Sequence, residues 1–431
     1  MRDFARSDDP AVQLQLDRLA ALSVPQGRLG LETIRALLAL LGNPERRLPP
    51  VFHVAGTNGK GSTCAFLRAI LEADDKRVHV TTSPHLVRYN ERIRVAGELI
   101  CDARLAAVLA EVLDAGADLG PSFFEVTVAA AFLECARVPA DACVVEVGLG
   151  GRFDATNVLG PDVLAVCGIA ALGIDHEQFL LAPEGGAPTE PLARIAFEKA
   201  GITKPGVPLC ALSCPHAPML EIERAAMTHG APLALMGRDW HVSLDVAGVH
   251  YEDRHGRLEL PAPHLPGAHQ AENAGLAIAM LRQQDRVSVE AEAYAEGIVT
   301  AQWPARLQRL HTGPLVGMRE VWLDGGHNAS AGAMLAKHFA GRPLHLVIGM
   351  LSAKDPASLA GPLASSLQSI TVVPVPGHEW HAAEAFCAQA RQAANVRSAL
   401  VELPDDGLPV LIAGSLYLAG EVLRLNEELP E

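Results

Sequence analysis

Residues 51–63 read VFHVAGTNGKGST, and this stretch decides the fold that the rest of the chain is expected to follow. Its first five residues are rich in β-formers and predict a buried strand, whereas the apolar spacing from Thr63 to Ile70 predicts a helix. Three glycines lie between the two. Backbone N–H groups in such a turn can wrap a phosphate, while the helix N-terminus and Lys60 supply positive charge. The sequence therefore favours a phosphate-binding loop, although Gly61 stands where the standard motif has Ser or Thr.

The same theme of strand, turn and helix recurs on both sides of this loop. We expect further strands at Arg77–Thr81, Ala142–Val147 and Val163–Ile169, which predicts an α/β fold with a parallel sheet covered on both faces. The last third of the chain repeats the pattern with different turns. Its expected strands are Glu320–Leu323, Leu344–Ile348, Ile370–Val375 and Val410–Ala413.

A domain boundary is expected near residue 300. The segment AQWPARLQ, residues 301–308, contains Pro304, which removes a backbone donor and favours an extended linker. Residues 1–300 would then form a larger domain and residues 301–431 a smaller one. In open α/β sheets ligands bind beyond the carboxyl ends of strands, so a nucleotide site between two such domains is the default expectation.

Composition limits the classes of function. The 431 residues are 49% hydrophobic and 20% charged, with a formal net charge of −15 that disfavours a nucleic-acid partner. The eight cysteines are scattered, mostly in apolar runs, as expected for free thiols in a reducing compartment. The polar start MRDFARSDDP resembles no signal peptide, and no apolar run is long enough to span a membrane. We therefore expect a cytoplasmic protein.

Four polar residues stand out because of their surroundings. Glu146 lies in an apolar strand before a glycine turn, so it should either form a buried ion pair, for which Arg152 is the candidate partner, or bind a cation. His176 is expected directly after a strand and could be a metal ligand or a structural histidine. Lys199 near a helix end could be salt-bridged, or could react as a neutral amine with CO₂. Asp154 could contact a substrate or cap a turn.

Nine segments, taken together and in order from about residue 28 to residue 420, resemble one family. The chain is similar to the Mur ligase superfamily, and more closely to folylpolyglutamate synthases and dihydrofolate synthases, and we expect the bifunctional bacterial type. The resemblance implies a P-loop-type ATP-binding domain followed by a Rossmann-like ligase domain. The matching segments are VAGTNGKGST, SPHLVRYNERIRV, EVGLGGRFDATN, DHEQFL, EKAGI, HQAENAGLA, WPARLQ, LDGGHN and GSLYLAGE.

The resemblance also assigns roles to residues of this chain. ATP contacts fall on Thr57, Asn58, Gly59, Lys60, Gly61, Ser62, Asn273, Arg306 and Asp324. Ligands for one or two Mg²⁺ ions fall on Ser83, Glu146, His176 and, if carbamylated, Lys199. Catalytic roles fall on Lys60, His176, Lys199, Arg306 and His327. Pterin contacts fall on Arg28, Leu29, Gly30, Ser122, Phe123, Phe124, Glu125, Phe153, Asp154 and Ala155.

The implied activity is an ADP-forming ligation of an acid to an amino acid. A carboxylate of dihydropteroate or a reduced folate would attack the γ-phosphate of ATP, and the amine of L-glutamate would attack the resulting acyl phosphate. Arg306 would reach the phosphates when the domains close. Alternatives are a polyglutamylation-only enzyme, a cell-wall Mur ligase and a non-catalytic nucleotide-binding protein. Members of the family are commonly monomers, so we expect a monomer.

Overall fold

The computed structural model describes residues 6–22 and 30–430 and divides the chain into two compact units. None of the helices in these residues is both long and apolar enough to cross a membrane. The second unit takes in two short segments that come earlier in the chain than its main body. Unit 1 comprises Met1–Pro84, Arg88–His264 and Gln270–Gln302, and unit 2 comprises His85–Val87, Leu265–His269 and Trp303–Glu431.

An eight-stranded sheet forms the centre of unit 1. Its order is β4-β3-β2-β5-β1-β6-β7-β8, and the strands from β2 to β8 run parallel, while β3 and β4 are antiparallel additions at one edge. The strands are β1 Val51–Ala55, β2 Val78–Thr81, β3 Ile93–Val95, β4 Glu98–Leu99, β5 Ala142–Glu146, β6 Leu164–Ile169, β7 Leu209–Ala211 and β8 Leu233–Leu235.

Helices cover both faces of this sheet because alternate side chains of each strand point to opposite sides. Helices α1, α2, α4, α5, α7 and α8 share one hydrophobic cluster with Val51, Val145 and Ile169. Helices α3 and α10 pack together, and α9 brings Met280 against Gly168 on the other face. These helices are α1 Pro10–Ala20, α2 Glu32–Leu40, α3 Lys60–Ala73, α4 Asp102–Ala115, α5 Phe123–Arg137, α7 Pro191–Ala200, α8 His216–His229, α9 His269–Arg282 and α10 Ala291–Thr300.

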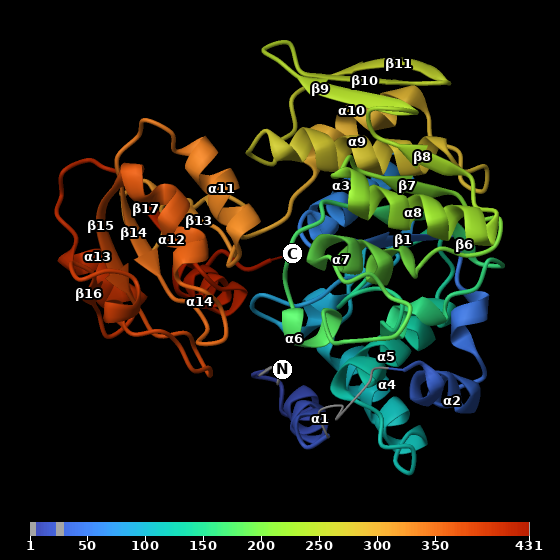
Figure 1. Ribbon diagram of the computed structural model, residues 1–431. Helices are drawn as coiled ribbons and strands as arrows, with labels where there is room; N and C mark the ends of the chain where they lie inside the picture. The colour runs from blue at the N-terminus through green and yellow to red at the C-terminus, as the bar shows by residue number, and fades with distance from the viewer. Residues whose placement is uncertain (1–5, 23–29, 431) are drawn as a thin grey trace. The chain divides into compact units, whose positions relative to one another are not determined.

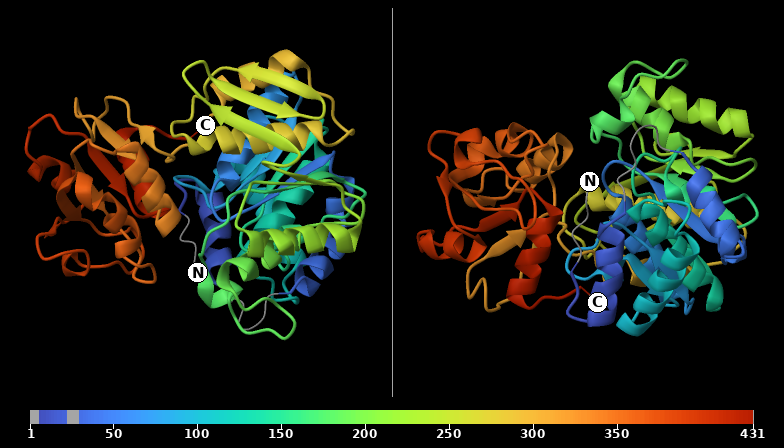
Figure 2. Two further views of the ribbon diagram at one scale, coloured as in Figure 1. Left: turned by 45° about the horizontal axis from the view of Figure 1, so that its top comes forward. Right: turned by 90° about the horizontal axis from the view of Figure 1, so that it is seen from below.

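A separate three-stranded antiparallel sheet, which the sequence analysis did not foresee, lies outside α9 and α10 (Figures 1 and 2). Its strands are β9 Trp240–Leu244, β10 Val249–Asp253 and β11 Gly256–Leu260. Trp240 stacks on Tyr251 with ring centroids 5.9 Å apart. Gly275 of α9 has no side chain, which lets Val242 and Trp240 approach its backbone closely.

Unit 2 is built on a six-stranded sheet of order β12-β13-β17-β14-β15-β16, with only β12 antiparallel. Helices α11 and α12 share one hydrophobic cluster with β14, and α13 and α14 share another with β13 and β17. The elements are β12 Gln308–Arg309, β13 Val321–Leu323, β14 Leu344–Ile348, β15 Leu367–Val372, β16 Arg391–Gln392, β17 Val410–Ala413, α11 Ala329–His338, α12 Ala357–Leu363, α13 Val396–Glu402 and α14 Leu416–Asn426.

The α/β architecture predicted from the sequence is confirmed, with two differences in detail. The strand expected at Ile370–Val375 is β15, but it starts and ends three residues earlier. The expectation that His176 directly follows a strand is wrong. Strand β6 ends at Ile169, and residues 170–175 form an irregular segment that reaches back to the glycine-rich loop.

Candidate functional site

The glycine-rich loop joins the carboxyl end of β1 to the N-terminus of α3. Its first N–H groups, those of Thr57 and Asn58, donate to the carbonyl of Ala171 at 2.9 and 3.1 Å, so the segment after β6 holds the start of the loop. At the N-terminus of α3 the first N–H groups have no acceptor within the helix, and the N-cap residue Gly59 has no side chain with which to cap them. The loop therefore offers backbone donors and a helix dipole to an anion.

Gly59 is required by the shape of this loop. Its φ of +82° lies in the left-handed region, and a Cβ atom there would lie 2.3 Å from Oδ1 of Asn273. Asn273 is in α9, where its amide donates to Gln270 at 2.9 Å, and Gln270 in turn lies 3.4 Å from the Ser62 hydroxyl. Two buried amides of α9 thus support the loop from behind.

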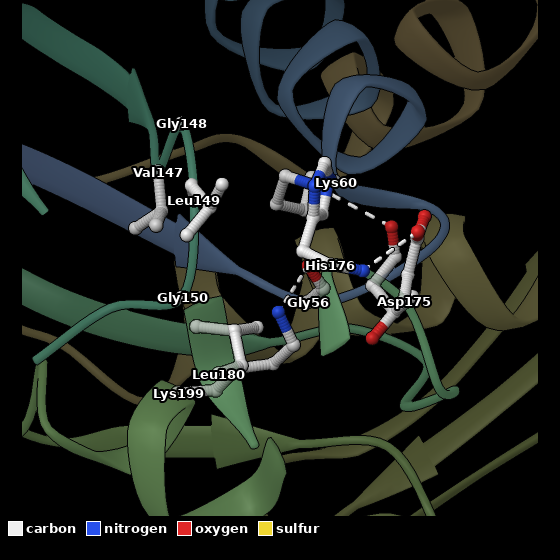
Figure 3. Close-up of a pocket in the computed structure, with 11 residues that line it drawn as sticks. Gly56, Lys60, Val147, Gly148, Leu149, Gly150, Asp175, His176, Leu180 and Lys199 are labelled. Carbon is white, nitrogen blue, oxygen red and sulfur yellow. Dashed lines mark hydrogen bonds between the residues drawn. The ribbon is translucent and has the colours of Figure 1, made fainter. Parts of the chain in front are cut away.

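A small pocket opens at this loop (Figure 3). Three basic side chains that are far apart in the chain, Lys60, His176 and Lys199, line it together, as Figure 3 shows. Lys60 keeps its amine 3.5 Å from the carbonyl of Thr57. The other lining residues are Gly56, Thr57, Val147, Gly148, Leu149, Gly150, Asp175 and Leu180.

Lys199 has the most perturbed environment in the pocket. Only 4% of the residue is exposed, and its amine donates to the carbonyl of Gly56 at 2.9 Å (Figure 3). Burial, together with the positive charge of Lys60, lowers the pKa of Lys199 from 10.5 to about 7. A substantial fraction of this amine is therefore neutral near pH 7, and a neutral amine is a nucleophile.

Glu146 ends β5 beside Val54 of β1, immediately before the part of the chain that lines the pocket. It is 6% exposed and accepts the N–H of Ser83 at 3.1 Å. The charges of both Glu146 and Lys60 act on the pKa of the buried Cys64 thiol in α3, raising and lowering it respectively. Glu146 therefore lies close to the phosphate-binding helix.

The suggested ion pair between Glu146 and Arg152 does not form. The Arg152 guanidinium instead binds Glu184 at 2.5 Å and Glu198 at 2.8 Å. A buried carboxylate beside a serine suits a hard divalent cation. Within residues 6–22 and 30–430, no group of three or more His, Cys, Asp or Glu side chains could hold a metal ion. A site at Glu146 would thus need other donors as well, such as a hydroxyl.

His176 is held by its backbone as much as by its surroundings. Its φ of 53° is left-handed, its N–H donates to Asp175 at 2.8 Å, and it starts the short helix α6, Glu177–Leu180. His176 lines the pocket from this position. The structure thus brings Lys60, His176 and Lys199 into one pocket and Glu146 beside it.

The residues assigned to pterin binding fall into three groups. Arg28 and Leu29 lie outside the described residues, and Gly30 precedes α2. Ser122 caps α5 in a reciprocal box with Glu125, and the ring of Phe124 packs so tightly on Gly148 that a Cβ there would lie 2.3 Å from it. Phe124, at the start of α5, therefore packs against a wall of the pocket.

Asp154 adopts the capping role that was one of its two expected alternatives. Its carboxylate accepts the N–H groups of Leu149 and Thr156 at 2.8 and 3.0 Å and the Thr156 hydroxyl at 2.5 Å. It caps the 3-10 helix η3, Ala155–Val158, whose first residue, Ala155, is buried. Phe153 lies beneath the Arg152 guanidinium, 4.4 Å from ring centroid to Cζ.

In unit 2, Arg306 is presented by an unusual stretch of backbone. Both of its neighbours, Ala305 and Leu307, are left-handed, with φ of 56° and 48°. Asp324 at the end of β13 stabilises this shape by accepting the N–H of Leu307 at 2.8 Å, and it also accepts that of Gly326 at 2.7 Å. Burial raises the pKa of Asp324, while the charge of Arg306 opposes the increase.

His327 and Asn328 follow in the same turn. The Nδ1 atom of His327 lies 3.1 Å from the carbonyl of Gly325, and the Asn328 side chain caps α11 through the N–H of Ala331. The resemblance placed a role on His327, and its turn connects β13 to α11 at the carboxyl end of the strand. This end is where ligands bind in open α/β sheets.

Two residues of the site were missed from the sequence. Gln270, fully buried against Ser62, is in the HQAEN segment that was singled out only for Asn273. Asp175 lines the pocket and acts on the pKa of Lys199, which its charge raises. Its position next to His176 was the available signal.

Comparison with known proteins places the chain in a family. No family model matches it. Dihydrofolate synthase/folylpolyglutamate synthase of Escherichia coli is 37% identical over 362 residues, covering 83% of this chain and 80% of the relative. Folylpolyglutamate synthase of Lacticaseibacillus casei is 32% identical, covering 90% and 92%. The chain belongs to the folylpolyglutamate synthase/dihydrofolate synthase family.

Solved structures agree with this placement. The E. coli FolC in complex with DHPP and ADP superposes with a TM-score of 0.85 at 30% identity, covering 97% of this chain and 98% of that one. The bifunctional enzyme from Yersinia pestis complexed with AMPPNP and Mn ion gives a TM-score of 0.83 at 29% identity, covering 98% and 99%. Both proteins bind adenine nucleotides, and the second binds a divalent metal as well.

Proposed function

We propose that the protein is an ATP-dependent amide ligase that joins L-glutamate to dihydropteroate, to folates, or to both, releasing ADP and phosphate. The observation that carries this proposal is the pocket where Lys60, His176 and Lys199 meet at the glycine-rich loop. Such a site can bind a polyphosphate and stabilise the negative charge that develops during phosphoryl transfer. A related enzyme binds Mn, AMPPNP and L-glutamate, which are the corresponding reactants.

The reaction proceeds in two transfers. The acceptor carboxylate attacks the γ-phosphorus of ATP, the bond to the bridging oxygen breaks, and ADP leaves an acyl phosphate behind. The neutral amine of glutamate then attacks the acyl carbon, phosphate departs, and the amine loses its proton. The N–H groups at the start of α3 and the amine of Lys60 stabilise the charge that develops on the transferred phosphoryl group.

The metal-binding residues are proposed to be Ser83, Glu146 and His176, with Lys199 as a carbamate. The neutral amine of Lys199 would attack CO₂ and lose a proton, forming an anion in place of a cation. Its lowered pKa supports this step, because a protonated amine has no lone pair to donate. Mg²⁺ bound by these residues would neutralise phosphate charge.

The remaining assignments of the resemblance are also proposals. Asn273 supports the loop that binds the phosphates, and Arg306 with Asp324 and His327 forms the contribution of unit 2 to nucleotide binding and catalysis. For the pterin, the side chains that begin α5 are the better supported group, because Phe124 packs on the pocket wall at Gly148. Asp154 would act indirectly, by holding the turn from which Phe153 projects.

We favour an enzyme that uses both dihydropteroate and folates as acceptors over one that only adds glutamate to folates. The relatives from E. coli and Bacillus subtilis carry both activities in their names, whereas the one from L. casei is named for polyglutamylation only. We also propose a cytoplasmic monomer that does not bind nucleic acid. Eight free cysteines and the net charge of −15 support this description.

The function is tested by ADP release in the presence of glutamate and one acceptor at a time. Dihydropteroate and tetrahydrofolate are expected to support turnover, whereas a UDP-muramoyl acceptor is not. Lys60→Ala should abolish turnover with the fold intact, and Lys76→Ala, which alters an ion pair with Asp74 away from the pocket, is the matched control. Turnover with the muramoyl acceptor alone, or an active Lys60→Ala variant, would refute the proposal.

A further inference from the structure

Four charged side chains behind the pocket form a closed ring of ion pairs, which we call the ion quartet: Arg152, Glu184, Arg194 and Glu198. Arg152 binds Glu184 at 2.5 Å and Glu198 at 2.8 Å. Arg194 binds the same two carboxylates at 2.8 and 2.9 Å. Each carboxylate therefore bridges two guanidinium groups, and the quartet has no net charge. Arg194 and Glu198 have side chains only 7% and 6% exposed.

The quartet joins three segments that are separate in the chain. Arg152 follows β5, Glu184 is in the segment between α6 and α7, and Arg194 and Glu198 are in α7. Two hydrogen bonds to backbone carbonyls reinforce the joint. The backbone N–H of Arg152 donates to the carbonyl of Glu198 at 2.8 Å, and the side-chain Nε of Arg194 donates to that of Leu180 at 3.1 Å. All three segments are thus fixed to one another.

The same three segments form the walls of the pocket. Residues 148–150 precede Arg152, His176 and Leu180 precede Glu184, and Lys199 directly follows Glu198. Two of these walls, the segment after β5 and the end of α7, pack so closely that Gly151 has no room for a side chain. A Cβ on Gly151 would lie 2.8 Å from the carbonyl of Glu198 and 2.9 Å from that of Lys199. A shift of any wall would therefore move Lys199.

Arg152 is the member whose shape matters most. Its guanidinium lies over the ring of Phe153 at 4.4 Å and over that of Phe197 at 4.8 Å. A planar, delocalised cation can stack on rings while it binds two carboxylates along its edge, and a lysine ammonium cannot do both. The quartet is therefore a fixed geometry and not only a balance of charge.

We propose that the ion quartet is a positioning device for the pocket, in which Glu184 and Arg152 hold the α7 end so that Lys199 meets the Gly56 carbonyl and the residues of the metal site. The inference rests on the proposed function, since it concerns the carbamate and turnover of that same site. None of the four residues is among those that line the pocket, and they act through Lys199 and through the segment that begins at His176. No member of the quartet bonds directly to the glycine-rich loop, which α9 and the segment after β6 support.

The test uses Glu184→Gln, which keeps the size of the side chain but removes its charge. Loss of a supporting partner behind a metal ligand lowers activity by about 10- to 100-fold, so kcat for ADP release should fall by about that factor. The KM for ATP should change by less than about twofold, because the phosphate loop is not altered. The carbamate signal of ¹³CO₂-treated protein, identified by its absence in Lys199→Ala, should weaken in parallel.

Glu111→Gln is the matched control. Glu111 pairs with Arg137 at 2.6 Å, with both side chains well exposed, and should leave kcat and the carbamate signal unchanged. Arg152→Lys provides a second variant that keeps the charge but loses the planar fork. It should reproduce the loss of kcat, and it decides the question should Glu184→Gln fail to fold.

The outcomes separate this inference from the function on which it depends. Wild-type kcat and carbamate signal in a folded Glu184→Gln or Arg152→Lys variant would overturn the positioning role. So would a loss of activity that tracks the fraction of unfolded protein and disappears on cooling, since that result is purely structural. If the wild-type protein shows no ligase activity, or Lys199→Ala retains it, the proposed function itself fails.

Discussion

Replacing the buried Lys199 should stabilise the protein while it inactivates the site. The pKa of this amine falls from 10.5 to about 7 because burial disfavours its charged form. That difference corresponds to roughly 5 kcal/mol of folding free energy that is lost wherever the folded lysine carries its proton. The hydrogen bond to the carbonyl of Gly56 offsets about 1–2 kcal/mol of this cost. We therefore expect Lys199→Met to gain roughly 3 kcal/mol below pH 7.

The sign of the pH dependence follows from the two pKa values. Below about pH 7 the amine of Lys199 is protonated in both the folded and the unfolded chain, so the cost is constant. Between about 7 and 10.5 the unfolded chain binds more protons than the folded one, and stability of the wild-type protein rises with pH. The advantage of Lys199→Met should therefore shrink steadily over this window and vanish near roughly pH 9. At the upper end of the window the wild type should be the more stable by about 1–2 kcal/mol, because only the lost hydrogen bond to Gly56 then separates the two proteins.

Urea unfolding in CO₂-depleted, metal-free buffer measures this difference, because the amine then stays unmodified. Unit 1 can be followed alone through labelling of the Cys64 thiol, which is 1% exposed in the folded protein. Lys199→Ala at the same pH values is the control. Like Lys199→Met it loses the hydrogen bond to Gly56, but it also lacks a side chain of similar length. A Lys199→Met variant less stable than wild type at pH 6, or an advantage that stays constant from pH 7 to pH 10, would refute the reasoning.

Three further outcomes are expected. Gly59→Ala should weaken ATP binding at least about tenfold in calorimetry, because the left-handed backbone costs an alanine about 1–2 kcal/mol and its Cβ would meet Asn273. An unaltered affinity for ATP would contradict this expectation. Chelation with EDTA should abolish ADP release, and added Mg²⁺ should restore it, whereas turnover at full rate in EDTA would exclude the metal site. Asp324→Asn should lower the stability of unit 2 by about 1–3 kcal/mol in thermal unfolding, because an amide has one oxygen for the two N–H groups of Leu307 and Gly326. An unchanged melting temperature would show that those bonds do not hold the turn.

The sequence predicted those parts of the fold that depend on local patterns. Strand β1 has the predicted bounds, Val51–Ala55, because five consecutive residues are buried and β-forming. The helix carrying Lys199 ends before Gly201, as expected from a glycine at that position. Strand β15 was placed three residues late, since its first half is only partly buried and lacks the apolar run of a central strand.

Other features depend on contacts between distant parts of the chain. Gln270 supports Ser62 across 208 residues, and nothing in the local pattern of either segment requires that partner. The segment containing Glu184 reads as a loop rich in glycine and proline, with no periodicity that would assign it a neighbour. The three-stranded sheet was not predicted. Trp240, Val242 and Leu244 alternate with polar residues as in a half-buried strand, but Leu244 is exposed and no continuous apolar run marks the strand.

The site also explains why the strongest sequence signal was insufficient to define it. The glycine-rich loop supplies donors for a phosphate, but Lys199 reaches that loop only through its bond to the carbonyl of Gly56, 143 residues earlier. Such a lysine is unfavourable in isolation, because burial opposes its charge. It stays in place since α7 is anchored elsewhere, by Glu198 and the other members of the ion quartet. The ion quartet thus stabilises the position of α7, which permits the unfavourable burial of Lys199 in the pocket. Mutations of the quartet and of Lys199 should therefore have separable effects on stability and on activity.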